Sequence, residues 1–460
     1  MSAREHWSSR IGFILAAAGS AIGLGTMWML PYVIGQNGGG AFILLFLLFT
    51  LLIGIPLFVT ELLLGRQAQR GVVGAFAKFS HNQSSWRILG WLGVVCTYLV
   101  AGWYAVVSGW GLNYMLLSLA DSFKGRTPSE ITGIFETFRA SGDLNVLWQA
   151  VFVLTTASIV MKGLSKGIEY WTRILTSTLF VLLVALAIYS STLSGYQQAV
   201  HYILFPDFSQ LTSAGVLKAL SMALFALSLG EGIMVTYGSY MSPRDDVPKT
   251  SLIVGISIIF ISILIALTIF PMVFTFGYAP ESGEGLVFKT LPYVFNQLPG
   301  STIIAFVFFT LLSFAALTST VAQLEVLVAN HIDLHGWSRK KAVWVSSVGI
   351  FLVGLPTALS DSTYTIFETW PQIFQKSFLH TNYILIDWML AIFAFFTAIF
   401  VGWVIPKQVR ESGFLTGTSL GGLYKPWLFL VRFVVPTAIL LVILHHAELF
   451  DAAVLTRLFG

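Results

Sequence analysis

The sequence is poor in charge and has a single cysteine. Charged side chains make up 10% of the 460 residues and hydrophobic ones 56%, whereas soluble proteins carry roughly 25% charged residues. A lone Cys96 excludes a disulfide framework and a thiolate metal cluster. The chain also lacks HExxH and P-loop patterns and any basic tract interleaved with aromatics. We therefore find no catalytic constellation and expect neither an enzyme nor a nucleic-acid partner.

Long apolar runs are abundant instead. Runs of about 20 residues, the length that crosses ~30 Å of hydrocarbon, recur along the chain and predict about eleven transmembrane helices. They cover residues 10–34, 40–65, 88–119, 147–161, 167–190, 214–240, 251–277, 299–330, 341–358, 379–404 and 426–446. The first run continues into the glycine-rich residues 19–25, so we interpret it as a retained span and not as a signal peptide. The sequence predicts an all-α membrane protein with one transmembrane domain over residues 1–446 and a tail over 447–460.

Basic residues fall mainly on one side of these predicted spans. If the N-terminus is cytoplasmic, the inner segments hold Arg4, Arg10, Arg66, Arg70, Lys78, Arg87, Lys162, Lys166, Arg244, Lys249, Arg339, Lys340, Lys341, Lys407, Arg410 and Lys425. The outer segments hold only Lys124, Arg126, Arg139, Lys289, Lys376 and Arg457. The positive-inside rule then predicts a multi-pass protein of the cell inner membrane with its N-terminus in the cytoplasm.

Glycines interrupt two of the apolar runs at mid-depth. The first interruption, over residues 19–25, is followed by Pro31, and the second covers residues 228–232. Broken helix is tolerated in a membrane only inside protein or beside a watery cavity. Two such breaks, in the first and sixth spans, indicate a solute site near the midplane. They also suggest two repeats of opposite topology, over 10–190 and 214–404, with 426–446 as an extra span.

Several stretches resemble one known family. They are residues 4–40, 61–66 (ELLLGR), 164–169 (LSKGIE), 236–240 (TYGSY), 314–319 (FAALTS) and 336–341 (GWSRKK). These stretches are similar to the neurotransmitter:sodium symporter family, especially its bacterial amino-acid transporters. The resemblance implies the leucine-transporter fold, a five-plus-five inverted repeat that holds substrate and sodium at unwound parts of spans one and six.

The resemblance implies Na⁺ as cofactor, at one of the family's two sodium sites. The matching ligands are the carbonyls of Gly19, Ile22 and Ala315 and the hydroxyls of Thr318 and Ser319. Five neutral oxygens suit a hard monovalent cation. The alternative is that the two hydroxyls merely bond back to their own helix.

The positions that match the family's other sodium site have lost side-chain oxygens. Its side-chain oxygens fall on Thr26, on Ala226, and on Ile258 or, with a one-residue slip, Ser257. Each lost oxygen leaves a water of hydration unreplaced. We expect this site to be absent, the alternative being that Glu231 supplies the missing oxygen.

The two family gates differ in this chain. Arg4 and Asp333 match an ion pair at the cytoplasmic gate, with Trp7 and Tyr240 beside it. The alternative for that pair is two solvated loop charges. At the extracellular gate, Met29 and Asn382 stand where the family has an arginine and an aspartate. The two charges are expected to be lost together, because one buried charge without its partner is costly.

The substrate pocket also follows by position. The amides of Leu24 and Gly25 and the Tyr104 hydroxyl match groups that hold a carboxylate, since an N–H cluster at a half-helix N-terminus attracts anions. The carbonyls that match the amine site belong to Ala21, Phe225, Ala226 and Ser228, and the side chains around the substrate are Val100, Phe225, Ser228, Glu231, Ser319 and Gln323.

Glu231 is the departure from the family that matters most, because relatives place an apolar residue there. An ionisable residue within a span is functional by default. It could bind a cationic or amine group of the substrate, carry a proton, or be a satisfied structural carboxyl; Gln323 adds polarity and favours the first. A second intramembrane carboxyl, Glu61, is expected to bond the unwound backbone of span one or span six.

These observations predict a sodium-coupled symporter of an amino acid or related amine, including a cationic one, that works by alternating access. The alternatives are a proton-coupled or sodium-independent transporter and a transport-dead sensor with the same fold. The expected partners are the small-molecule solute and membrane lipid, with the chain a monomer or weak homodimer.

Overall fold

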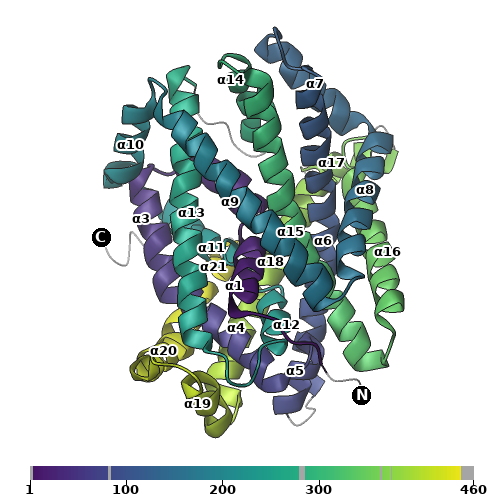
Figure 1. The fold of residues 1–460 in the computed structure, drawn as a ribbon, viewed down its shortest axis with the longest axis vertical. Coiled ribbons are helices and arrows are strands. Elements are labelled where there is room, and N and C mark those ends of the chain that lie inside the picture. The colour runs from purple at the N-terminus through teal and green to yellow at the C-terminus, as the bar shows by residue number, and fades with distance from the viewer. Residues whose placement is uncertain (1–3, 81–83, 279–284, 363–364, 375, 447–460) are drawn as a thin grey trace.

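The computed structural model describes residues 4–80, 84–278, 285–362, 365–374 and 376–446, and these are helical or irregular with no β-strand among them. The predicted tail, 447–460, lies outside the described residues. Long helices run roughly along one direction and pack around α1, which lies in the middle of the bundle (Figure 1).

Nine helices among the described residues are long and apolar enough to cross a membrane. They are α3–α4 (Gly40–Ala68), α6 (Ser84–Leu119), α8 (Gly142–Val160), η3–α9 (Leu164–Ser191), α13 (Val247–Thr275), α15 (Ser301–His335), α16 (Arg339–Ala358), α18–η6 (Phe378–Val404) and η7–α21 (Gly421–His445). Each falls on a predicted span.

The two remaining predicted spans are the broken ones. The first consists of α1 (Arg10–Ala21) and η1–α2 (Gly25–Gln36), which are bent by 50° at the break and together form a tenth span. The sixth consists of α11 (Ser213–Phe225) and α12 (Ile233–Ser239), separated by non-helical residues 226–232. Counting it as a span gives the predicted eleven.

Backbone conformation explains why the sixth span breaks where it does. Gly230 and Gly232 have φ of 87° and 73°, and Ser228 has φ of 52°. Positive φ is easy for glycine and unfavourable for other residues, so the glycines permit the unwound path while Ser228 needs support from its neighbours. That support is a hydrogen bond from its side chain, described below.

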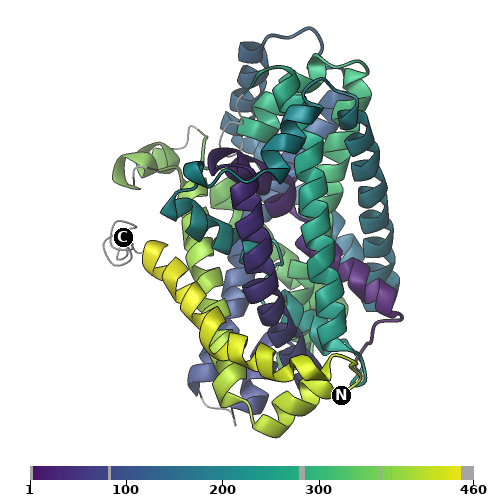
Figure 2. The same cartoon turned by 90° about the vertical axis from the view of Figure 1, so that its left-hand side faces the viewer.

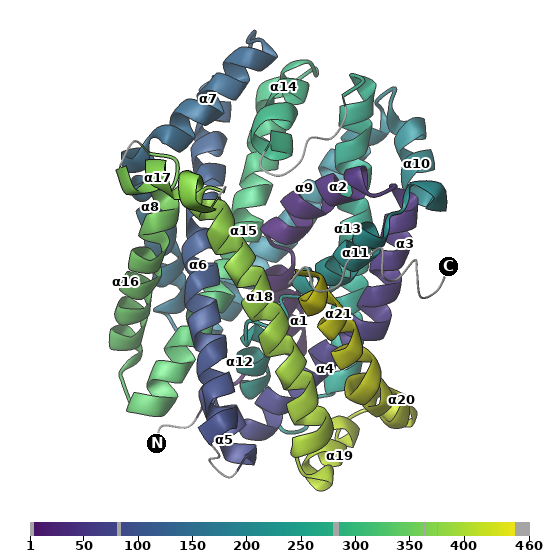
Figure 3. The same cartoon turned by 180° about the vertical axis from the view of Figure 1, so that it is seen from behind.

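Short helices close the two ends of the bundle. At the end away from the N-terminus lie α7 (Pro128–Ala140), α10 (Tyr196–Leu204), α14 (Leu291–Asn296) and α17 (Thr365–Phe374) (Figures 1 and 3). At the N-terminal end lie α5 (Val72–Phe79) and α19 (Lys407–Leu415), and from there α21 (Val435–His446) climbs the outside of the bundle (Figure 2). A capping box starts α7, because Thr127 and Glu130 bond each other's backbone N–H.

Candidate solute and sodium site

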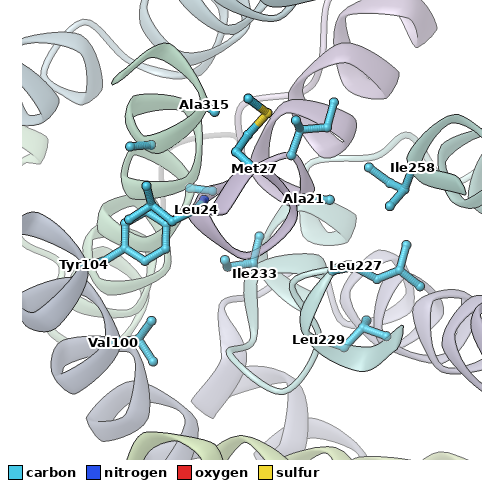
Figure 4. Packing of buried hydrophobic residues seen from close by; sticks show 14 of the residues in the cluster. Ala21, Leu24, Met27, Val100, Tyr104, Leu227, Leu229, Ile233, Ile258 and Ala315 are labelled. Carbon is cyan, nitrogen blue, oxygen red and sulfur yellow. The ribbon is translucent and has the colours of Figure 1, made fainter. Parts of the chain in front are cut away.

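The two helix breaks meet at the carbonyl of Ser20. The Ser228 hydroxyl in the second break donates to the Ser20 oxygen at 2.9 Å, and the Ser319 hydroxyl of α15 donates to the same oxygen at 2.8 Å. A carbonyl has two lone pairs and can accept both bonds. Residues far apart in sequence are thereby joined in the middle of the bundle, among the buried apolar side chains of Figure 4.

Oxygen atoms gather around the Thr318 hydroxyl. Its Oγ1 lies 2.6 Å from the carbonyl oxygen of Gly19, 2.9 Å from that of Ala315 and 3.2 Å from that of Phe314. The Ser319 Oγ lies 3.3 Å from the same Ala315 oxygen. A hydroxyl has one proton, so this cluster has more acceptors than donors. The Gly19 oxygen comes from the first broken span and the other two carbonyls from α15 itself, so the cluster could surround a cation with neutral oxygens from both segments.

Four of the five predicted sodium ligands are therefore brought together, and the hydroxyls bond across to α1 as well as back to their own helix. The fifth, Ile22, ends α1, with its N–H bonded to the Ala18 oxygen at 2.8 Å. The chain thus offers carbonyl and hydroxyl oxygens but no carboxylate in this set, as suits Na⁺.

The positions of the other family sodium site are poor in oxygen. Thr26 donates to the carbonyl of Gly23 at 3.1 Å, and Ala226 is apolar. Ile258 is fully buried in the apolar cluster (Figure 4), whereas the Ser257 hydroxyl donates at 2.8 Å to Ile253 of its own helix. A slip of one residue therefore does not supply the missing ligand.

The predicted carboxylate-binding groups are adjacent. The Leu24 N–H, freed by the break, donates to the Tyr104 hydroxyl at 2.5 Å, and Figure 4 shows Tyr104 and Val100 on α6 facing this part of α1. Gly25 lies against the Phe225 ring, which occupies the space that a Cβ would need. A ligand carboxylate could replace the tyrosine as acceptor of the Leu24 N–H.

Glu231 is a buried residue of the second break and lies beside Gln323 of α15. Its side chain is 5% exposed, and its Oε2 accepts a hydrogen bond from the Gln323 Nε2 at 3.0 Å. Its backbone carbonyl accepts from Thr97 of α6 at 2.8 Å. Glu61 of α4 accepts from the Gly230 N–H at 3.0 Å, which confirms that Glu61 bonds unwound backbone and places that bond on span six.

The N-terminal end is closed by charged and aromatic contacts. The Arg4 guanidinium binds both oxygens of Asp333 at 2.8 and 2.9 Å and also the hydroxyl of Ser239 at 2.5 Å. Arg4 lies over the Tyr240 ring, and Trp7 donates to the Tyr237 carbonyl at 3.0 Å. The four predicted gating residues therefore lie together.

A buried ion pair continues this closure and was not foreseen as part of it. Glu325, fully buried on α15, accepts from the Tyr240 hydroxyl and from Arg339, each at 2.5 Å. Glu325 is thus paired with a basic residue of the chain itself. A carboxylate inside a span, followed by the arginine of GWSRKK, was the available signal. Below them Arg4, Arg339 and Asp333 line a cavity of about 680 Å³.

The opposite end is closed by aromatic rings. Trp28 of η1 stacks on Trp103 of α6 with centroids 6.0 Å apart, and Trp103 contacts Tyr383 of α18 at 5.6 Å. Met29 is buried, and Asn382 bonds Thr357 at 3.1 Å. Where the family has an ion pair, this chain therefore has a buried methionine and a neutral amide beside stacked rings.

Two broken helices that meet at mid-bundle, with an oxygen cluster between the first break and α15, define a transporter with the leucine-transporter fold, a five-plus-five inverted repeat with unwound first and sixth spans. The model of the sodium:neurotransmitter symporter family matches residues 4–129 and 127–455. The chain belongs to that family.

Similar proteins agree. A solved structure of MhsT in complex with L-phenylalanine superposes with a TM-score of 0.85 at 39% identity, over 96% of this chain and 99% of MhsT. An uncharacterised sodium-dependent transporter, YhdH, of Bacillus subtilis is 37% identical over 96% of this chain and 97% of its own length. An uncharacterised sodium-dependent transporter of Haemophilus influenzae is 32% identical over 96% of this chain and 98% of its own length. The chain is thus a membrane transporter of a sodium-dependent family.

Proposed function

We propose that this protein is a sodium-coupled symporter of an amino acid or related amine that works by alternating access with one sodium ion. The observation that carries the proposal is the surplus of oxygen atoms around Thr318, which ties the first break to α15. A cation bound there would hold the two together. Sodium would thereby complete the neighbouring site at Leu24 and Tyr104, which is the physical basis of coupling.

The solute class rests on the groups that surround the breaks. The Leu24 N–H and the Tyr104 hydroxyl would hold a carboxylate, and the carbonyls of Ala21, Phe225, Ala226 and Ser228 an ammonium group. MhsT, the similar structure, holds the amino acid L-phenylalanine. Val100, Ser319, Gln323 and Glu231 would surround the rest of the solute.

Alternating access would use the two closures described above. Opening toward the cytoplasm requires the Arg4–Asp333 and Glu325–Arg339 pairs to separate, and opening outward requires the Trp28–Trp103 stack to part. The excess of basic residues at the N-terminal end supports a cytoplasmic location for that end, because positive residues favour the inner side of a membrane. We propose the inner membrane as location and a monomer or weak homodimer as the assembly.

Uptake by purified protein in proteoliposomes tests this function. Labelled amino acids should accumulate when an inward sodium gradient is imposed and should not when choline replaces sodium. Accumulation driven by a proton gradient alone would favour the second candidate, a proton-coupled carrier that uses the buried carboxyl of Glu231. Sodium-dependent binding without any uptake would identify a sensor.

A further inference from the structure

The solute pocket has too few hydrogen-bond donors around Glu231. Glu231 and Gln323 share one hydrogen bond, and the Gln323 Oε1 is buried without a partner. A carboxylate can only accept, so Gln323 must turn its NH₂ toward Glu231 and leave its own oxygen unpaired. Glu61, which holds the neighbouring Gly230, has an unpaired Oε2 as well.

No ion pair of Glu231 exists within the described part of the chain. Buried carboxylates are rare unless a cation pairs with them. By contrast, the buried carboxyl of Glu325 has Arg339 at 2.5 Å. The two buried glutamates therefore differ. Glu325 is paired with an arginine of the chain, whereas Glu231 has no cationic partner among the described residues.

The placement of Glu231 matches the far end of a bound amino acid. Ser319 and Gln323 lie one turn apart on α15, which separates them by ~6 Å along the helix. Ser319 contacts the first break beside the carboxylate-binding groups, and Gln323 contacts Glu231. Three or four methylene groups beyond the Cα would span one turn, so a flexible cationic side chain could reach from one to the other.

We propose that the solute carries a cationic side chain, a guanidinium or a primary ammonium, whose N–H groups bind Glu231 and the free oxygen of Gln323. This inference rests on the proposed symport function and specifies its substrate class. The cation supplies at once the charge that Glu231 lacks and the donor that Gln323 lacks. An all-carbon side chain would supply neither.

Matched pairs of solutes test the inference on the unaltered protein. Arginine is compared with citrulline and lysine with norleucine, each as a competitor in sodium-dependent uptake. The charged member should compete roughly 30-fold or more better, the range for one partner of a buried charge pair. Equal or better competition by citrulline and norleucine would overturn the inference.

Two variants provide the second test. Glu231→Gln keeps the shape and removes the charge, so it should abolish the preference for arginine over citrulline and for lysine over norleucine, measured as the ratio of the two competitors in each pair. Glu136→Gln, at an exposed carboxylate paired with Lys289, is the matched control and should retain the preference. If Glu231→Gln does not fold, the matched solute pairs decide alone.

The outcomes separate this inference from the proposed function. Sodium-driven uptake restricted to neutral amino acids overturns the inference and leaves symport standing. An unchanged order of solutes in Glu231→Gln with loss of pH dependence also overturns it and identifies a proton carrier. Uptake of none of these solutes under a sodium gradient refutes both.

Discussion

At the scale of single residues, Thr318 has the most informative surroundings. Its hydroxyl could have been an ordinary helix residue bonded to the carbonyl four positions back, and it does approach Phe314. Its shortest contact, however, crosses to Gly19 at 2.6 Å. The FAALTS motif predicted this meeting of spans one and eight, because the carbonyl it requires is freed only where α1 ends. Sequence alone left open whether the hydroxyl reaches across; that depends on packing distance.

Removing the two hydroxyls together should weaken sodium activation. In the double variant Thr318→Ala and Ser319→Ala, two of five proposed oxygen ligands disappear. We expect the sodium concentration for half-maximal uptake to rise at least ~10-fold, about 1.4 kcal/mol, because the ion's lost hydration is no longer replaced. Sodium titration of uptake in proteoliposomes measures this.

Thr320→Val is the matched control on the same helix. Its hydroxyl faces Thr156 at 3.1 Å rather than the first break, so sodium activation should stay at the wild-type level. Unchanged sodium activation in the double variant would show that Thr318 and Ser319 do not bind the sodium ion.

At the scale of helices, most of the architecture could be predicted, because apolar length and glycine position are local properties. The break at 228–232 follows from Gly230 and Gly232, which adopt positive φ. The aromatic closure by Trp28, Trp103 and Tyr383 could not be predicted, because it joins three spans whose rotation about their axes depends on the whole packing. Which of Ser257 and Ile258 occupies the ligand position of the second family sodium site likewise depends on the rotation of α13 about its axis, which the sequence does not determine.

The N-terminal segment connects the ends of helices α12 and α15. Arg4 binds Ser239 at the end of α12 and Asp333 near the end of α15. Its pair with Asp333 is partly buried, with side chains 15% and 19% exposed. Arg4→Ala should therefore shift the closed state toward opening by about 1–3 kcal/mol, between the values for exposed and buried pairs.

A cysteine in the cavity reports this opening. Cys96 is the only cysteine and is buried, so Ala329→Cys in a Cys96→Ala background places one thiol in the cavity wall. Labelling by a membrane-impermeant thiol reagent applied from the N-terminal side should be roughly 5–150-fold faster with Arg4→Ala. Arg139→Ala, which breaks the Arg139–Asp361 pair at the opposite end, should leave the rate unchanged. Equal rates for both variants would show that Arg4 does not hold this end closed.

At the scale of the whole molecule, sodium-driven transport requires that ion binding in the middle of the bundle act on the closures at its two ends. The chain keeps an ion pair at one end and replaces the other with aromatic rings, so the two closures differ in kind. Among the described residues, the oxygen cluster at Thr318 joins the first break to α15, whereas the second family position has Ala226 and the buried Ile258. With the single sodium ion of the proposed function, the energy transferred from sodium to solute would be limited to what one ion supplies.

The number of coupled ions sets the highest gradient that the protein can maintain. With the membrane voltage held at zero, a tenfold sodium gradient supplies about 1.4 kcal/mol per ion. One coupled sodium can thus sustain at most ~10-fold accumulation of solute, and two could sustain ~100-fold. We expect tenfold accumulation at most, together with a sodium Hill coefficient near 1, measured in proteoliposomes with potassium and valinomycin clamping the voltage. Accumulation clearly above tenfold, or a Hill coefficient approaching 2, would mean that a second ion binds, and that oxygens other than those at Thr26, Ala226 and Ile258 hold it.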